Sequence, residues 1–225
     1  MLVVIAGTVA RAQDTVQDTP QDTPQVTPQV TAQDAHHESS SGAEGGSWAS
    51  QSMTRGAWEF GVIAGGGSDL TYSTDTHFLD AGVRLGLILS GNHGEGWRRG
   101  NFEWAVEFLP VYTVFTPQEG AVYGGSFKPV IWRWNFTSGK KIAPYASIAG
   151  GILFSTNNIP PGVTSWVNFT PQAAVGANIF RARNQALIVE ASYVHHSSAG
   201  LGEFNPGYNG SFFFTVGYTW FRGER

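Results

Sequence analysis

The sequence predicts an all-β fold, an eight-stranded antiparallel up-and-down transmembrane β-barrel preceded by a disordered N-terminal tail. From residue 57 onward, about eight segments alternate apolar and polar side chains with the period of two that is typical of β-strands. The 225 residues include 29 glycines, and aromatic and charged residues each make up 13% of them, a balance typical of all-β proteins whose surface is not wholly in water. In the segment 186–200, one face is apolar and the other carries a glutamate, as expected of a strand whose apolar face meets lipid.

Residues 1–12 indicate the end of a signal peptide. The apolar run 2–10 precedes Ala10-Arg11-Ala12, a small-x-small pattern that suits cleavage before Gln13. Residues 13–46 are a degenerate repeat of Gln, Thr, Pro and Asp followed by a polar stretch. Such a sequence has almost nothing to bury, so we expect a disordered linker. The outer-membrane barrel domain is therefore expected over residues 47–225.

The predicted strands follow one another along the chain. They cover residues 58–65, 79–89, 102–109, 130–136, 142–154, 167–179, 186–198 and 212–220. Most approach the roughly 9–11 residues that a tilted transmembrane strand needs. Proline removes a hydrogen-bond donor from the ladder, so we expect each proline in or beside these segments at a bulge or a strand end. These prolines are Pro110, Pro129, Pro144 and Pro171.

One face of the predicted strands carries charged side chains of both signs. They are Glu59, Asp80, Arg84, Glu103, Glu107, Arg133 and Glu190. Inside a filled barrel such charges can pair with one another, whereas on a lipid-facing surface an arginine would cost about 2–4 kcal/mol at the bilayer midplane and a carboxylate somewhat less. Aromatic residues near the strand ends, among them Trp58, Trp132 and Trp220, resemble the girdles at membrane interfaces and favour a membrane barrel over a soluble one.

Composition excludes several classes of function. The net charge of -4 gives no basic footprint, so nucleic acid is not an expected partner. The chain has no cysteine, which excludes a disulfide scaffold and a thiolate metal site. No apolar run approaches the roughly 18 residues that a membrane-spanning helix needs. We expect no metal and no cofactor.

Strand counting predicts which connections face outward. With the N-terminus in the periplasm, the odd-numbered strands run outward and are followed by the longer connections, 65–77, 117–125, 155–165 and 199–209. The end of the seventh strand, with His195 and Ser197 on its more apolar face, then lies at the level of the outer leaflet. Histidine is the usual base that activates a serine nucleophile near neutral pH. A third group must orient the imidazole, and Glu203, Asn205 and Asn209 lie nearby in the sequence.

On its own, the pattern H-x-S is more often a polar strand end than a catalytic pair. The longer stretch from His195 to Asn209, H-H-S-S-A-G-L-(x)3-N-P-G-Y-N, resembles the signature of outer-membrane lipid A 3-O-deacylases. In that family, H-x-S-N-A-G is followed by an Asn and a Gly, and then by a Glu twelve residues after the serine. The resemblance implies an eight-stranded barrel with a catalytic triad on its outer surface. Two positions depart from the pattern, because Ser198 replaces the family's Asn and Asn209 replaces its Glu.

The resemblance also implies residue roles. Ser197 would be the nucleophile and His195 the general base, while backbone amides near Ala199 and Gly200, with Ser198 as a helper, would stabilise the oxyanion. Asn209 would orient His195 through its amide oxygen, without stabilising the imidazolium by charge. Glu203 is the alternative orienting acid.

The implied function is an outer-membrane esterase that removes an ester-linked acyl chain from lipid A of lipopolysaccharide in the outer leaflet. A first alternative is a non-catalytic small outer-membrane β-barrel with a structural or adhesive role. A second is a soluble secreted β-barrel that binds an apolar ligand, since alternation alone fits a soluble barrel as well as a membrane barrel. A homodimer is compatible with each of the membrane interpretations.

Overall fold

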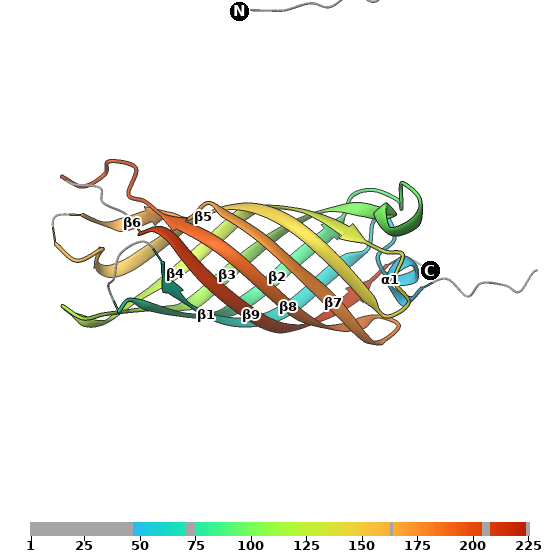
Figure 1. Cartoon of the computed structure of the whole chain (residues 1–225), viewed down its shortest axis with the longest axis horizontal. Helices are drawn as coiled ribbons and strands as arrows, with labels where there is room; N and C mark the ends of the chain where they lie inside the picture. Colours follow the sequence, from blue (N-terminus) through green and yellow to red (C-terminus); the bar gives the residue numbers. More distant parts are fainter. Residues whose placement is uncertain (1–46, 71–74, 163, 204–207, 224–225) are drawn as a thin grey trace, which may run out of the picture. The chain divides into compact units, whose positions relative to one another are not determined.

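A single antiparallel sheet of nine strand segments closes into a barrel in the computed structural model, which describes residues 47–70, 75–162, 164–203 and 208–223 (Figure 1). The segments are β1 (Trp58–Asp69), β2 (His77–Ile88), β3 (Gly100–Thr116), β4 (Gly120–Phe136), β5 (Ile142–Ile159), β6 (Ser165–Phe169), β7 (Gln172–Ala182), β8 (Gln185–His196) and β9 (Tyr208–Arg222). A short α-helix, α1 (Trp48–Ser52), precedes β1, and a 3-10 turn, Gly96–Arg98, lies between β2 and β3. The predicted signal peptide, 1–12, and linker, 13–46, lie outside the described residues.

The barrel has eight antiparallel strands, as predicted. Except for β6 and β7, each segment pairs with the next along the chain, and β1 also pairs with β9, so that the sheet closes. Both β6 and β7 pair with β5, and only Thr170 and Pro171 separate them. These two segments therefore form one interrupted strand, so the nine segments make up eight strands of the barrel.

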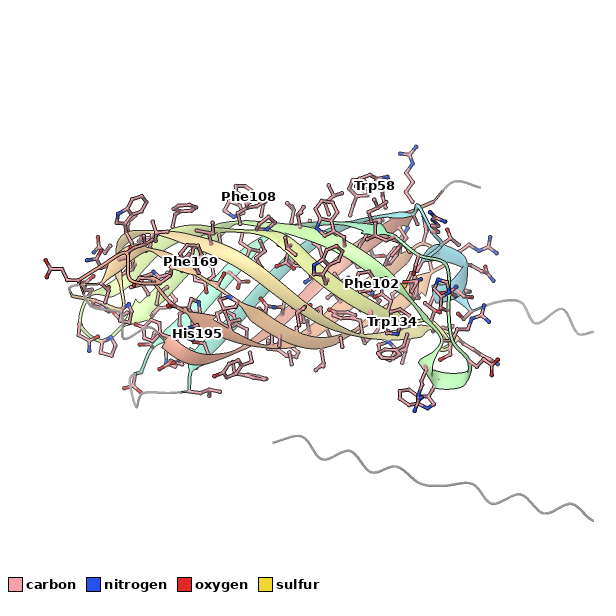
Figure 2. The ribbon with its side chains drawn as sticks, turned by 90° about the horizontal axis from the view of Figure 1, so that it is seen from above. Trp58, Phe102, Phe108, Trp134, Phe169 and His195 are labelled. Carbon is pink, nitrogen blue, oxygen red and sulfur yellow. The ribbon has the colours of Figure 1, made fainter. Side chains whose placement is uncertain are left out.

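The two faces of the sheet are inverted relative to a soluble protein. Phe60 and Val62 are 48% and 50% exposed on the outside, whereas Glu59, which precedes Phe60, and the other predicted interior charges are buried. Figure 2 shows Trp58, Phe102 and Phe108 projecting from the outer surface. The soluble interpretation is wrong, because in a soluble barrel the charged face would meet water. Among the described residues no helix is long and apolar enough to cross a membrane.

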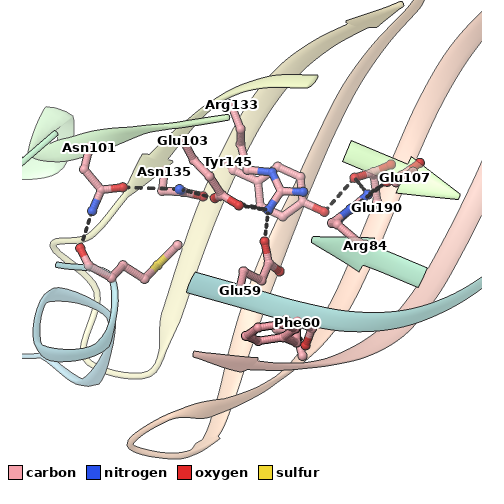
Figure 3. A network of polar contacts seen from close by, with 12 residues as sticks. Glu59, Phe60, Arg84, Asn101, Glu103, Glu107, Arg133, Asn135, Tyr145 and Glu190 are labelled. Carbon is pink, nitrogen blue, oxygen red and sulfur yellow. Dashed lines mark hydrogen bonds and ion pairs between the residues drawn. The ribbon is translucent and has the colours of Figure 1, made fainter. Parts of the chain in front are cut away.

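The interior is filled by two layers of ion pairs. In the layer nearer α1, Arg133 Nη1 lies 2.9 Å from Glu59 Oε2 and 3.3 Å from Glu103 Oε2, and the Arg133 guanidinium lies over the Tyr145 ring (Figure 3). The Asn135 side-chain amide donates to Glu103 at 2.7 Å. Burial of each carboxylate is thus offset by an arginine or an amide donor, as the mixed signs of the polar face predict.

The second layer is centred on Arg84. Its Nε donates to Glu107 Oε1 at 2.6 Å and its Nη2 lies 3.0 Å from Glu190 Oε2. Lys128 also pairs with Glu107 at 2.9 Å, and the Tyr145 hydroxyl donates to Glu190 at 2.8 Å, which links the two layers. A cavity of about 20 Å³ among these side chains has room for about one water molecule.

The prolines lie where the ladders are interrupted, as predicted. The β3–β4 register shifts between Leu109 and Tyr112, on either side of Pro110, and the β4–β5 register shifts around Pro129. Pro144 directly precedes Tyr145, which is the first residue of β5 that pairs with β4. Pro171 separates β6 from β7.

The predicted outer connections were too long. Segments 65–69, 120–125 and 155–159 belong to strands, so the β3–β4 hairpin has only residues 117–119 between its strands. Glycines such as Gly124 and Gly125 weaken the alternation there, but the backbone ladders continue regardless of side-chain pattern. The connection between β8 and β9 remains long, and its residues 204–207 lie outside the described residues.

The helix α1 closes the barrel at the end where β1 begins and β9 ends (Figure 1). Ser47 caps the helix, since its Oγ accepts from the Ser50 amide at 3.0 Å. Ala49 and Met53 pack in a buried cluster with Phe180 and other strand residues, and the Asn101 amide donates to the Met53 carbonyl at 2.6 Å. The sequence pattern did not predict this helix.

Exposed charges differ in sign between the two ends of the barrel. We call the end with α1 the inner rim, because short turns and both ends of the barrel domain are typical of the periplasmic side. Among the residues that the structure describes, eight exposed cations lie there, against one exposed carboxylate, Glu95: Arg55, Arg98, Arg99, Lys140, Lys141, Arg181, Arg183 and Arg222. The opposite, outer rim carries only carboxylates, Asp69, Asp75, Glu119 and Glu203, and its connecting sequences contain no Lys or Arg.

Candidate functional site

His195 lies at the outer end of β8 on the lipid-facing side of the barrel (Figure 2). Ser197 directly follows β8 and shares that side of the chain by the alternation of buried and less buried residues, as predicted. Both are half-buried, and Tyr193 on the same face is 51% exposed. The alternate residues His196 and Ser198 are buried on the interior face. The sequence-predicted pair therefore faces the membrane at the rim that carries no cations.

The backbone around His195 is irregular on both sides. Toward β7, the His195 amide donates to the Pro171 carbonyl at 3.0 Å, and proline has no N–H to return. Toward β9, Val194 pairs with Ser211 but His196 pairs with Tyr208. Two residues of β9, 209 and 210, thus oppose the single residue His195, which is the arrangement of a β-bulge. Bulges bend a strand and re-aim its side chains, and they are frequent beside active sites.

Ser197 is held by its neighbours in the chain and across the sheet. Its amide donates to the Phe169 carbonyl at 3.0 Å, and the Phe169 amide donates back at 2.7 Å. The Ser197 Oγ accepts a hydrogen bond from the Ala199 amide at 3.1 Å. The hydroxyl oxygen is thereby oriented by a backbone donor two residues ahead.

The chain turns sharply directly after Ser197. The Leu201 amide donates to the Ser198 carbonyl at 3.0 Å, and the two central residues, Ala199 and Gly200, have φ values of 50° and 82°. Two successive positive φ values are typical of a type I′ turn. Ala199 is the one described non-glycine residue with positive φ, a conformation that side chains other than Gly, Asn and Asp rarely adopt. This strain lies at the residue whose amide contacts Ser197.

The candidate orienting residues lie on the chain after this turn. The bulge register brings the backbone of Asn209 next to His195, whereas its side chain lies outside the described part of the structure. Glu203 is exposed on the connection between β8 and β9. Asn205 lies outside the described residues.

A buried aromatic cluster supports the site from inside the barrel. The Tyr112 hydroxyl is 2.8 Å from His196 Nε2, and the His196 ring is stacked on Phe78 with a centroid distance of 4.9 Å. Tyr208 and Phe213 pack against the same ring. His196 is the residue between His195 and Ser197. The contacts of its side chain inside the barrel therefore hold in place the strand end that carries the two outward-facing residues. Sequence reasoning missed it, although the alternation places His196 on the interior face.

The surface around Ser197 is apolar. Phe169, Phe212 and Leu201 are 38%, 47% and 63% exposed near the end of β8. The Tyr193 ring lies against Gly210, where a side chain would collide with it. Such a surface suits the acyl chain of a lipid better than a polar substrate.

Comparison with known proteins assigns the family. A family model described as Lipid A 3-O-deacylase (PagL) matches residues 89–219, which include the H-x-S pair and Asn209. No curated protein shows significant sequence similarity to the chain.

Three of the solved structures that resemble the chain are as follows. The N-terminal β-barrel domain of Pseudomonas aeruginosa OprF is 12% identical, with a TM-score of 0.49 over 75% of this chain and 98% of that one. The outer membrane enzyme PagL is 19% identical, with a TM-score of 0.41 over 71% of this chain and 98% of that one. Pseudomonas aeruginosa OprG is 10% identical, with a TM-score of 0.43 over 77% and 99%. Because the family model spans more than half of the chain, this outer-membrane barrel belongs to the lipid A 3-O-deacylase (PagL) family.

Proposed function

We propose that the protein is an outer-membrane esterase that removes an ester-linked acyl chain from lipid A of lipopolysaccharide, with Ser197 as nucleophile and His195 as general base. The observation that carries the proposal is the position of this pair, side by side on the lipid-facing surface at the outer end of β8, in a chain of the lipid A deacylase family. An acyl ester in the outer leaflet would reach this surface without leaving the membrane.

The reaction follows from the two side chains. His195 takes the proton of the Ser197 hydroxyl while Oγ attacks the ester carbonyl and forms a tetrahedral intermediate. Collapse of the intermediate breaks the bond to the sugar oxygen, which receives the proton from His195, and leaves the acyl group on Ser197. Water, deprotonated by His195, then attacks the acyl-enzyme, and the fatty acid and free serine are released.

The Ala199 amide is the best placed oxyanion donor. It already lies 3.1 Å from Ser197 Oγ, and the oxyanion forms on the carbon that becomes bonded to that oxygen. The turn that holds this amide is stabilised by the hydrogen bond from Leu201 to the Ser198 carbonyl. Ser198 would thus act as a helper through its backbone, since its side chain is buried on the interior face.

Asn209 is the residue that would orient His195. Its backbone lies opposite His195 across the bulge, which favours it over the exposed Glu203. An amide oxygen can accept the imidazole N–H and fix the tautomer, but it lacks the negative charge that stabilises the imidazolium. We therefore expect a slow enzyme.

Recognition of the substrate would depend on its acyl chains. Lipid A carries phosphate groups at the membrane surface, yet the outer rim has no Lys or Arg with which to bind them. The exposed apolar side chains beside Ser197, such as Phe169 and Phe212, would instead contact the hydrocarbon. We infer a substrate held by its chains rather than by its headgroup charge.

Mass spectrometry of lipid A from outer membranes that carry the wild type or Ser197→Ala tests the proposal. We expect loss of one hydroxyacyl mass with the wild type and none with Ser197→Ala. Ser138→Ala is the matched control, since Ser138 is an exposed serine in the β4–β5 turn at the inner rim, far from the site, and it should retain full activity. If the wild type leaves lipid A unchanged despite correct insertion, or if Ser197→Ala remains active, the proposal is wrong.

The alternative is a non-catalytic small outer-membrane barrel with a structural or adhesive role. It is favoured by one specific observation, the replacement of the family's orienting Glu by Asn209. Unchanged lipid A in the experiment above would support it.

A further inference from the structure

The barrel has a second concave surface at the end opposite Ser197. A pocket of about 1100 Å³ lies at the inner rim between α1, the β7–β8 turn and the end of β9. Its walls include Ser52, Arg183, Asn184 and Arg222, and on the membrane side Phe60 and Trp220. The Ser52 hydroxyl donates to the Arg183 carbonyl, which joins the helix to the turn. We call this concavity the inner-rim pocket.

The two arginines of the inner-rim pocket are uncompensated among the described residues. Every ion pair found in the described parts of the chain lies inside the barrel and involves Arg84, Lys128 or Arg133. Arg183 and Arg222 are both exposed, and six further exposed cations surround them at the same rim. The pocket therefore has a positive potential, which favours an anionic ligand.

The membrane-facing wall is aromatic. Phe60 and Trp220 are paired across the β1–β9 ladder, and they are 48% and 41% exposed. Both stand on the outer surface near the inner ends of their strands, where aromatic residues of membrane barrels meet the headgroup region. A ligand in the pocket can thus contact guanidinium groups at one side and extend an apolar tail along the barrel wall at the other.

We propose that the inner-rim pocket binds the headgroup of an anionic glycerophospholipid from the inner leaflet. The planar guanidinium groups of Arg183 and Arg222 match the oxygens of a phosphodiester, with which arginine forms paired, charge-assisted hydrogen bonds. The Asn184 side-chain amide, which also lines the pocket, can donate to the glycerol or ester oxygens. The acyl chains pass over Phe60 and Trp220 into the bilayer.

A lipid fits these features better than a small soluble anion. A soluble anion would use the arginines but would leave the aromatic wall without a role. The site lies at the opposite end of the barrel from Ser197, so its occupation does not depend on the proposed esterase activity.

Native mass spectrometry of the detergent-solubilised full chain tests the proposal, with phosphatidylglycerol, phosphatidylcholine or inorganic phosphate added. The pocket variant carries Arg183→Ala and Arg222→Ala. The control variant carries Arg98→Ala and Arg99→Ala, which removes the same charge from the same rim outside the pocket. We expect wild type and control to retain phosphatidylglycerol in preference to phosphatidylcholine, and the pocket variant to retain it about tenfold more weakly, as expected for loss of charge-assisted bonds to phosphate.

Three results would overturn the proposal. Equal losses in the two variants would mean that rim charge alone attracts the lipid. Displacement of phosphatidylglycerol by an equal concentration of inorganic phosphate would indicate a site for soluble anions. If the wild type retains no phospholipid, the inner-rim pocket is not a phospholipid site. Heat-modifiable migration on gels, which reports a folded barrel, should be the same for all three proteins.

Discussion

The His195 amide donates to the Pro171 carbonyl at 3.0 Å, and Pro171 has no N–H to give back. A regular antiparallel pair in this position exchanges two hydrogen bonds, so the ladder between β8 and its neighbour makes one fewer bond beside the proposed base. On the other side of His195 the strand β9 bulges. The proposed catalytic histidine thus lies where the ladders on both sides of β8 are irregular.

Replacing Pro171 by alanine tests whether this irregularity positions His195. Pro171→Ala supplies an N–H that can complete the pair and straighten the strand end. We expect deacylation to become slower by about tenfold or more, because small displacements of a catalytic group are costly. The rate of lipid A deacylation measures the effect, while heat-modifiable migration should show an intact barrel. Pro144→Ala, at a distant strand end, is the control and should leave the rate unchanged.

His196→Phe should act through positioning. The variant keeps an aromatic ring against Phe78 but loses the hydrogen bond between His196 and the Tyr112 hydroxyl, a loss of about 1 kcal/mol in unfolding free energy. We expect kcat to fall while KM is maintained, because His196 is inside the barrel and does not touch substrate. Tyr112→Phe removes the same bond from the other partner and should reproduce the effect. Unaltered kcat in both variants would show that the cluster has a structural role only.

Asn209→Glu should increase activity. A carboxylate in place of the amide would stabilise the imidazolium that forms on His195, and the opposite exchange of an orienting carboxylate for an amide costs about 10⁴ in kcat in a serine protease. We expect a gain of about tenfold or more in the deacylation rate. Glu203→Gln is the companion variant and should have little effect. A large loss with Glu203→Gln and no gain with Asn209→Glu would reassign the orienting role to Glu203.

Arg133→Met should strongly destabilise the barrel. It leaves Glu59 and Glu103 buried without their cation, and removing one partner from a buried ion pair typically costs about 3–5 kcal/mol. Adding Glu59→Gln and Glu103→Gln should recover part of that loss. Lys140→Met, which removes an exposed cation, should change stability by less than about 0.5 kcal/mol. Urea unfolding in lipid vesicles would measure these differences, and equal effects of the two methionine variants would contradict the prediction.

Deacylation should not depend on the phosphates of lipid A. The outer rim lacks any lysine or arginine, so lipid A from which the phosphates have been removed should be cleaved as fast as the intact molecule. Competing both forms in the same vesicles and following each by mass spectrometry makes the comparison internal. A strong preference for the phosphorylated form would show that headgroup charge is recognised after all.

Side-chain alternation predicts the features that depend on which way a residue points. It places Glu59 and Arg84 inside the barrel and His195 and Ser197 outside, because period two is a local property of any strand. It does not reveal that Arg84 pairs with Glu190, since those residues are distant in the chain and their contact depends on strand order and register. The helix α1 has five residues, too few for a helical period to be visible. The bulge opposite His195 depends on how β8 and β9 pair and leaves no trace in either strand alone.

The two layers of ion pairs that fill the barrel also determine how any substrate must travel. With room for about one water molecule between them, the interior offers no route across the membrane for a lipid. A lipid substrate of the proposed site would therefore reach Ser197 from the side, by diffusion in the plane of the leaflet. Its turnover would then depend on the mole fraction of substrate in the membrane rather than on a concentration in solution.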